Sequence, residues 1–208
     1  MRLLIRFLPG VLLSLFAGGA MAIEEPKYTI LEQAKPFELR IYEPRIVAEV
    51  QVSGSMDQAS GRGFKLLADY IFGNNTARSG GSEKIAMTAP VAMEPRSEKI
   101  SMTAPVSMEQ SGGQWLVSFV MPSNFTMDTL PRPNNPAVNL REIPAKHYAV
   151  IRFSGLAGEE KVGSKTTELM EWMNNKGLQA VGEPELARYN PPWTLPFMRR
   201  NEIMVEYR

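Results

Sequence analysis

The segment SEKIAMTAPVAM (Ser82–Met93) is repeated fifteen residues later as SEKISMTAPVSM (Ser97–Met108), with ten of twelve positions identical. Read with the two-residue period of a strand, one face of each copy is entirely apolar. In the first copy this face holds Ile85, Met87, Ala89, Val91 and Met93. Both differences between the copies replace an alanine by a serine on the opposite face, which we expect to be wetter. The repeat predicts two strands with one face turned to a core or a ligand cleft.

Each copy also contains a proline, Pro90 in the first and Pro105 in the second. Proline lacks an N–H group, so each predicted strand should be short, bent or at the edge of a sheet. A simple hairpin or a pair of core strands without chemistry is the plainer alternative.

A second, weaker duplication relates the two halves of the chain. Leu39-Arg40 precedes Ser53-Gly54 by fourteen residues, and Leu140-Arg141 precedes Ser154-Gly155 by the same distance, so the two segments coincide at an offset of 101. We expect two related halves, at about 26–130 and 137–208, with the proline-rich stretch 131–136 as a loop between them.

Each half has alternating segments followed by a helical pattern. In the first half, FELRIY and IVAEVQV alternate, and Ser55-Met-Asp-Gln58 is a capping-box signature before a helix that Gly73 should end. In the second half, HYAVIRF alternates and apolar residues then recur at helical spacing from Val162 to Met173, before Gly177. Two such units predict an α+β domain with pseudo-twofold symmetry and a cleft between its halves.

Five motifs occur together along the chain: ADYIFGNN (68–75), KIAMTAPV (84–91), FVMPSNFTMDTLPRPNNP (119–136), AVIRFSG (149–155) and RYNPPWTLPFMRRNEIMV (188–205). In this order they resemble the SOUL family of haem-binding proteins, over the chain from about Pro26 to its C-terminus. The resemblance implies a distorted antiparallel β-barrel flanked by two helices. It also implies a hydrophobic cleft that binds haem or another porphyrin non-covalently, mainly through apolar contact.

The N-terminus has the pattern of a secretory signal. Arg2 and Arg6 precede an apolar run from Val11 to Phe16, and the small residues end in Ala20-Met21-Ala22. This pattern predicts a signal peptide over 1–22, cleaved near Ala22, and a mature domain over 23–208 that is periplasmic or secreted. A membrane anchor is the alternative, but Arg6, Pro9 and several glycines interrupt the apolar stretch, so we expect no stable membrane insertion after cleavage.

Charge and composition exclude several classes of protein. The chain has 23 basic and 22 acidic residues, and loss of Arg2 and Arg6 with the signal would leave 21 against 22, a net charge of −1. We therefore expect no nucleic-acid partner. With no cysteine, disulfides, thiolate ligation of haem and covalent haem attachment are impossible. The sequence does not determine the oligomeric state.

The predicted cofactor-binding residues fall into an apolar set and a cationic set. The apolar set is one face of the first helix with a lid of loop aromatics, namely Phe64, Leu67, Ala68, Ile71, Trp193 and Phe197. The cations, which would pair with haem propionates, are Arg62, Lys65, Arg199 and Arg200, with Arg188 also available. Core packing, solvated charge, or an ion pair between Arg200 and Glu202 are the structural alternatives. Asp69 departs from the basic residue that family members can carry there.

His147 is the only histidine, and we expect it to be structural rather than an axial ligand of haem iron. Methionines at alternating strand positions are more typical of core packing than of iron ligation. No catalytic motif is present, so an enzyme is not expected. Two alternatives stay open besides haem carriage, buffering or sensing: a binding domain for another amphipathic small molecule, or an enzyme acting on a tetrapyrrole through Glu83, Glu98 or Tyr70.

Overall fold

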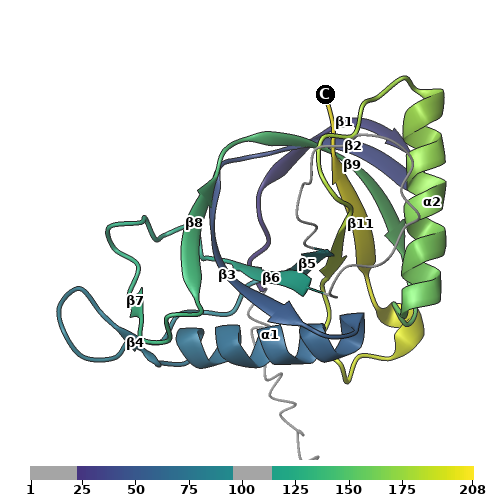
Figure 1. Ribbon diagram of the computed structural model, residues 1–208. Coiled ribbons are helices and arrows are strands. Elements are labelled where there is room, and N and C mark those ends of the chain that lie inside the picture. Colours follow the sequence, from purple (N-terminus) through teal and green to yellow (C-terminus); the bar gives the residue numbers. More distant parts are fainter. Residues whose placement is uncertain (1–22, 96–113) are drawn as a thin grey trace, which may run out of the picture.

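The computed structural model describes residues 23–95 and 114–208 (Figure 1). The predicted signal segment and the second copy of the repeat, including Pro105 and Glu98, lie outside the described residues. The described chain forms a large antiparallel sheet, two α-helices and a small two-stranded sheet of β4 (Asn75–Thr76) and β7 (Arg132–Pro133). Thus part of the predicted loop 131–136 is a short strand.

The large sheet has nine strands in the order β1-β2-β9-β11-β10-β5-β6-β3-β8. It curls into a half-barrel whose outside is covered by α1 and α2 (Figure 1). This architecture confirms the predicted α+β distorted barrel. The strands are β1 (Tyr28–Ala34), β2 (Phe37–Tyr42), β3 (Arg45–Ser53), β5 (Val91–Pro95), β6 (Gln114–Val120), β8 (Asn139–Ile143), β9 (Lys146–Phe153), β10 (Glu185–Arg188) and β11 (Asn201–Glu206).

The order of eight of these strands is pseudo-twofold. If β2, β3, β5 and β6 are exchanged with β8, β9, β10 and β11, the order from β2 to β8 is reproduced in reverse. The axis falls between β5 and β10, and the first strand of each half pairs with the second strand of the other. Gly54 and Gly155, 101 residues apart, follow β3 and β9 with φ of 122° and 97°. The left-handed backbone at both sites favours glycine.

Helix α1 (Met56–Ile71) begins at the predicted capping box. The side chain of Ser55 accepts from the N–H of Gln58, and the Gln58 side chain accepts from the N–H of Ser55. The helix packs on β3 and β6, and Gly63 allows close approach, because a Cβ there would lie 2.6 Å from side-chain atoms of Val117.

Helix α2 (Glu159–Asn175) covers β9 and β11. Its own residues Leu169 and Met173 are fully buried, and the ring of Trp172 stacks on Phe37 with centroids 4.8 Å apart. Gly177, with φ of 71°, follows the helix as predicted. Neither described helix is long and apolar enough to cross a membrane.

The first copy of the repeat is not the continuous strand that its period predicts. Only Val91–Pro95 forms a strand, β5. The preceding residues bond to three different segments: Ile85 N–H donates to Ile71, Ala89 N–H to Glu24, and the Thr88 hydroxyl to Val120. The predicted wetter face is wrong at Thr88 and Ala92, which are 4% and 5% exposed, whereas Ala86 on that face is exposed. Bonding to separate elements, which no local period encodes, overrides the alternation.

The two faces of the large sheet differ in chemistry. The face under the helices is an apolar core that includes Val50, Val117, Phe119, Ile151 and Ile203. The opposite face, here called the inner face, alternates with it along each strand. Its residues include tyrosines and charged residues, namely Arg40, Tyr42, Tyr148, Glu185, Tyr189 and Glu202. Charge and aromatic groups on the face without helices make it a first candidate for function.

Candidate functional site

A buried ionic network occupies one end of the inner face. The guanidinium of Arg40 donates to both carboxylate oxygens of Glu202, at 2.8 and 3.0 Å, and to the hydroxyl of Tyr42 at 2.9 Å. The hydroxyl of Tyr189 donates to Glu202 at 2.8 Å, and Arg200 pairs with the same carboxylate at 2.9 Å. Burial raises the pKa of Tyr42 to about 12. This network is satisfied within the protein and leaves little for a ligand to bind.

Arg200 was a predicted propionate partner, and the alternative ion pair with Glu202 is confirmed. Its guanidinium also lies 3.7 Å from the ring centroid of Tyr189 and pairs with Glu25 at 2.9 Å. Glu25 belongs to the segment Ile23–Lys27, in which Glu24 accepts from the N–H groups of Ala89 and Ser123. These contacts hold that segment against residues that precede β11 and β5 and that follow β6.

A second group of charges on the inner face is less completely paired. Burial raises the pKa of Glu185 to about 7, although Arg45 and other cations oppose the shift. The guanidinium of Arg45 lies over the rings of Tyr42 and Tyr148, 5.0 and 5.6 Å from their centroids. Its Nη1 is buried without a hydrogen-bond partner among the described residues. Arg45 and Glu185 line one small cavity together.

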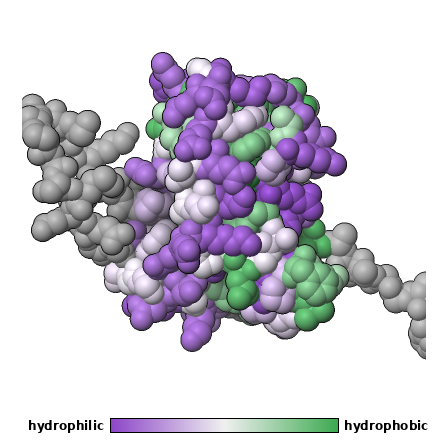
Figure 2. Space-filling view, turned by 90° about the vertical axis from the view of Figure 1, so that its right-hand side faces the viewer, coloured by the Kyte–Doolittle hydropathy of each residue, from purple (hydrophilic) through white to green (hydrophobic). Residues whose placement is uncertain are grey.

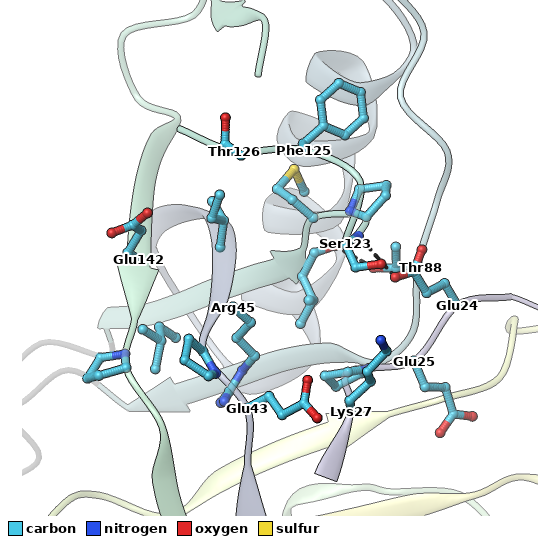
Figure 3. Close-up of a pocket in the computed structure, with 18 residues that line it drawn as sticks. Glu24, Glu25, Lys27, Glu43, Arg45, Thr88, Ser123, Phe125, Thr126 and Glu142 are labelled. Atoms are coloured by element: carbon cyan, nitrogen blue, oxygen red, sulfur yellow. Dashed lines mark hydrogen bonds between the residues drawn. The ribbon is translucent and has the colours of Figure 1, made fainter. Parts of the chain in front are cut away.

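That small cavity shares the lining residues Pro26, Arg45, Val120 and Ile143 with a larger one, here called the inner pocket, which has a volume of about 660 Å³. The pocket lies where β3 begins and β6 and β8 end, and the N-terminal segment forms one wall. Figure 3 shows Phe125 and Thr126 on one side of it and Arg45 and Glu43 on the other. Its volume suits a small organic ligand.

A separate hydrophobic surface lies outside the half-barrel, here called the loop patch. It consists of exposed large hydrophobic side chains on the loops after β9 and β10, namely Leu156, Trp193, Leu195, Phe197 and Met198. Trp193 is 82% and Phe197 73% exposed. Figure 2 shows hydrophobic side chains gathered in the lower part of the face that includes α2. Clustered exposed aromatics are typical of a binding surface.

The backbone beneath the loop patch is held by hydrogen bonds. Arg199 donates to the carbonyls of Thr194 and Pro192, and the N–H of Gly155 donates to Pro196. The short helix η1 (Pro196–Met198) adds a further turn. The loop is therefore ordered by its backbone while its aromatic side chains stay in solvent.

Arg188 joins these loops to helix α1. Its guanidinium donates to the Ser60 hydroxyl at 3.0 Å and to the Ala157 carbonyl at 2.9 Å, and it approaches Asp57 at 3.4 Å. Phe64 lies one turn after Ser60 on the same helix face. The structure thus brings this side of α1 next to the loops that carry the patch.

The predicted apolar residues differ in exposure. Phe64 is 37% exposed and packs its ring edge-on against Phe119, with centroids 5.5 Å apart. Trp193 and Phe197 belong to the loop patch. Leu67, Ala68 and Ile71 are 0%, 8% and 1% exposed, so they are core residues in this structure and present almost no surface to a ligand.

The predicted cations also differ. Arg199 donates to backbone carbonyls of its own loop, and Arg188 donates to Ser60 of α1 and to the Ala157 carbonyl. Arg62 donates to the carbonyl of Ser53. Lys65 is exposed and forms no ion pair within the part of the chain that the structure describes. Asp69 accepts a hydrogen bond from the Asn74 side chain at 2.5 Å, so its carboxylate is engaged within the protein at the C-terminal end of α1.

His147 lies at the start of β9, exposed, with its ring 5.7 Å from that of Tyr207. No cluster of three metal-binding side chains occurs among residues 23–95 and 114–208. Of the groups considered for an enzyme, Tyr70 is buried with its hydroxyl donated to the Pro131 carbonyl, and burial raises its pKa to about 12. Glu83 is exposed.

Sequence reasoning missed the inner pocket. Its lining comes from strand ends and from the N-terminal segment, which are brought together only by the curl of the sheet. The nearest hint in the sequence was the presence of the charged residues Arg40, Glu49 and Glu202 in largely apolar strands, but none of the three lines the pocket. Charged residues at such positions indicate a sheet face that is not simply a core.

Solved structures show the same fold at low sequence identity. The C-terminal domain of EcmrR has a TM-score of 0.58 and 12% identity, over 87% of this chain and 98% of that one. An uncharacterized conserved protein from Listeria innocua has a TM-score of 0.57 and 12% identity, over 83% and 92%. A hydrolase from the same organism has a TM-score of 0.55 and 10% identity, over 86% and 94%. These similarities establish the fold alone.

No protein of curated function matches the chain. A family profile, SOUL heme-binding protein, matches residues 23–206, which is almost the whole described chain and includes both the inner pocket and the loop patch. The chain therefore belongs to the SOUL family of haem-binding proteins.

Proposed function

We propose that this protein, after export, binds haem or a related tetrapyrrole non-covalently on the loop patch, for carriage, buffering or sensing. The supporting observation is that Trp193 and Phe197 are among the most exposed large side chains of a loop whose backbone is held by hydrogen bonds. An ordered loop that keeps aromatics in water loses little entropy on binding, which favours a flat apolar ligand.

Helix α1 supplies the second wall of the proposed site. Arg188 fixes the loops against the helix, and Phe64 is the exposed aromatic on that side. Lys65 follows Phe64 and offers an ammonium group to a propionate. If the ligand buries about 300 Å² of apolar surface, the gain is roughly 7 kcal/mol before costs, enough for micromolar binding without a metal bond.

The inner pocket is a poorer place for a tetrapyrrole with two propionates. Four carboxylates line it, those of Glu24, Glu25, Glu43 and Glu142, against the cations Lys27 and Arg45. Like charge disfavours a dianion there.

Titration of mature protein with haemin and with iron-free protoporphyrin IX tests the proposal. Apolar contact should bind both, and Trp193→Ala should weaken both by about 1 to 3 kcal/mol, or roughly 5- to 150-fold. Because Trp193 is exposed, the free energy of unfolding should change by less than about 1 kcal/mol.

Phe72→Ala is the matched control. Phe72 is 59% exposed at the far end of α1 and outside the patch, so its loss should leave porphyrin affinity unchanged. Unchanged affinity in Trp193→Ala and Phe197→Ala would remove the loop patch as the site. Absence of binding by the wild type would defeat the proposed function itself.

A further inference from the structure

The guanidinium of Arg45 forms no ion pair among the described residues, although the buried carboxyl of Glu185, whose pKa burial raises to about 7, lines the smaller cavity with it. The guanidinium stacks over two tyrosine rings, and its Nη2 reaches the Tyr148 hydroxyl only at 3.5 Å. Its Nη1 is buried with no acceptor in the described part of the chain. A buried donor without a partner costs free energy, and a charged donor costs most. Arg45 also lines the inner pocket, so an anionic ligand there would balance its charge.

The space beside Arg45 is apolar on one side, although four carboxylates and Lys27 also line the pocket. The inner pocket, of about 660 Å³, is lined on the sheet and the following loop by Val120, Met121, Phe125, Ile143 and the prolines Pro122 and Pro144. An apolar wall beside a cationic group favours an amphipathic ligand, with its apolar part on that wall and its charged group toward Arg45.

The remaining charges limit that ligand to one anionic group. Glu24 is already bonded to the Ser123 N–H and Glu25 to Arg200. Glu43 and Glu142 lie on the pocket lining without an ion pair among residues 23–95 and 114–208, and Figure 3 places Glu142 across the pocket from Glu24. A second anionic group would meet these carboxylates, while a cationic head beside Arg45 would be repelled.

We propose that the inner pocket is a second ligand site, which binds an apolar molecule with a single carboxylate that pairs with the guanidinium of Arg45. The apolar part lies along Val120, Met121 and Phe125. This site is distinct from the loop patch and does not depend on tetrapyrrole binding.

Isothermal titration of the mature protein with three twelve-carbon probes, below their micellar concentrations, tests the ligand class. Dodecanoate should bind at least tenfold more tightly than dodecanol, which lacks the charge, and dodecyltrimethylammonium should not bind. Equal affinity for all three would show a merely apolar surface and overturn the proposal. Preference for the ammonium compound would overturn it as well.

Variants test the position of the site. Arg45→Met keeps an unbranched apolar stem, removes the guanidinium, and should weaken dodecanoate binding about 10- to 100-fold without changing that of dodecanol. Arg132→Met removes an exposed arginine that does not line the pocket and should have no effect. If both variants weaken dodecanoate binding equally, the loss of any positive charge has the same effect. Arg45 is then not the group that binds the carboxylate.

Trp193→Ala separates this site from the proposed porphyrin site. It should leave dodecanoate affinity unchanged, and saturating protoporphyrin IX should not displace dodecanoate. Displacement would mean that both ligands bind the same surface, and it would overturn the proposal of a second site. If Arg45→Met does not fold, the three-probe series and the Trp193→Ala comparison still decide the question on folded protein.

Discussion

Arg40 on β2 and Glu202 on β11 form a two-pronged ion pair across the intervening strand β9, at 2.8 and 3.0 Å. Their side chains are 1% and 0% exposed. Burial alone would raise the pKa of Glu202, but hydrogen bonds and charge from Arg40 and Arg200 hold it below its usual value. Removal of either partner would leave a buried charge that is no longer balanced.

We therefore expect Glu202→Gln to lower the free energy of unfolding by about 3 to 5 kcal/mol, measured by urea denaturation at pH 7. Because the pKa is lowered on folding, the stabilisation is present above the usual value of 4.5 and is lost as the pH falls through the folded-state pKa. The variant should lack this acid-dependent loss.

Glu206→Gln is the control on the same strand. Glu206 pairs with Lys146 at 2.6 Å, but both side chains are more than a quarter exposed. Its loss should cost less than about 1 kcal/mol. An equal effect of the two substitutions would mean that the burial of the Arg40–Glu202 pair has no special role.

Glu185 should give the opposite dependence on pH. Burial raises its pKa to about 7, against Arg45, Lys146 and Arg141, with Glu94 adding to the rise. A carboxyl whose pKa is raised on folding stabilises below 4.5 and loses that contribution as the pH rises through 7. At pH 8, Glu185→Gln should be more stable than wild type by on the order of 1 to 3 kcal/mol, and at pH 4 the two should be equal.

The test is urea denaturation at several pH values between 4 and 8, with Glu171→Gln as control. Glu171 is an exposed residue of α2, and its variant should follow the wild-type curve. If Glu185→Gln is no more stable than wild type at pH 8, Glu185 is hydrated rather than desolvated.

Two glycines of α1 test the close packing of this helix on β6. At Gly61 a Cβ would meet nothing within 4 Å, so Gly61→Ala should stabilise by about 0.5 to 1 kcal/mol through helix propensity. At Gly63 a Cβ would lie 2.6 Å from Val117, so Gly63→Ala should destabilise by about 1 to 3 kcal/mol. Thermal denaturation of both variants checks the difference, and effects of the same sign would contradict the packing.

The helices and the fold class were predictable because their signals are local. Ser55 with Gln58, and Gly177 after the second helical pattern, mark helix ends in the sequence itself. The offset of 101 likewise placed Gly54 and Gly155 at equivalent strand ends. Local chemistry fixes these features before any tertiary contact forms.

The inner face could not be predicted in the same way. The partner of Arg40 is 162 residues away, and Arg45 meets Glu185 only because β3 and β10 lie on one curled sheet. The apolar period of Ser82–Met93 was misleading for a related reason, since Thr88 is buried by a bond to Val120 rather than by strand pairing. Long-range pairing, not periodicity, determines these positions.

His147→Ala should leave the affinities for haemin and for protoporphyrin IX within a few-fold of wild type. Phe153, at the other end of β9, pairs with Asn201 next to the loop patch, and six residues of strand put His147 about 20 Å away from it. Met198, 62% exposed within the patch, is the better-placed iron donor, so Met198→Leu is the informative comparison. If haemin binding involves iron ligation there, Met198→Leu will weaken haemin but not protoporphyrin. A hundredfold loss of haemin affinity in folded His147→Ala, with a shifted Soret band, would instead identify His147 as the ligand and move the tetrapyrrole away from the loop patch.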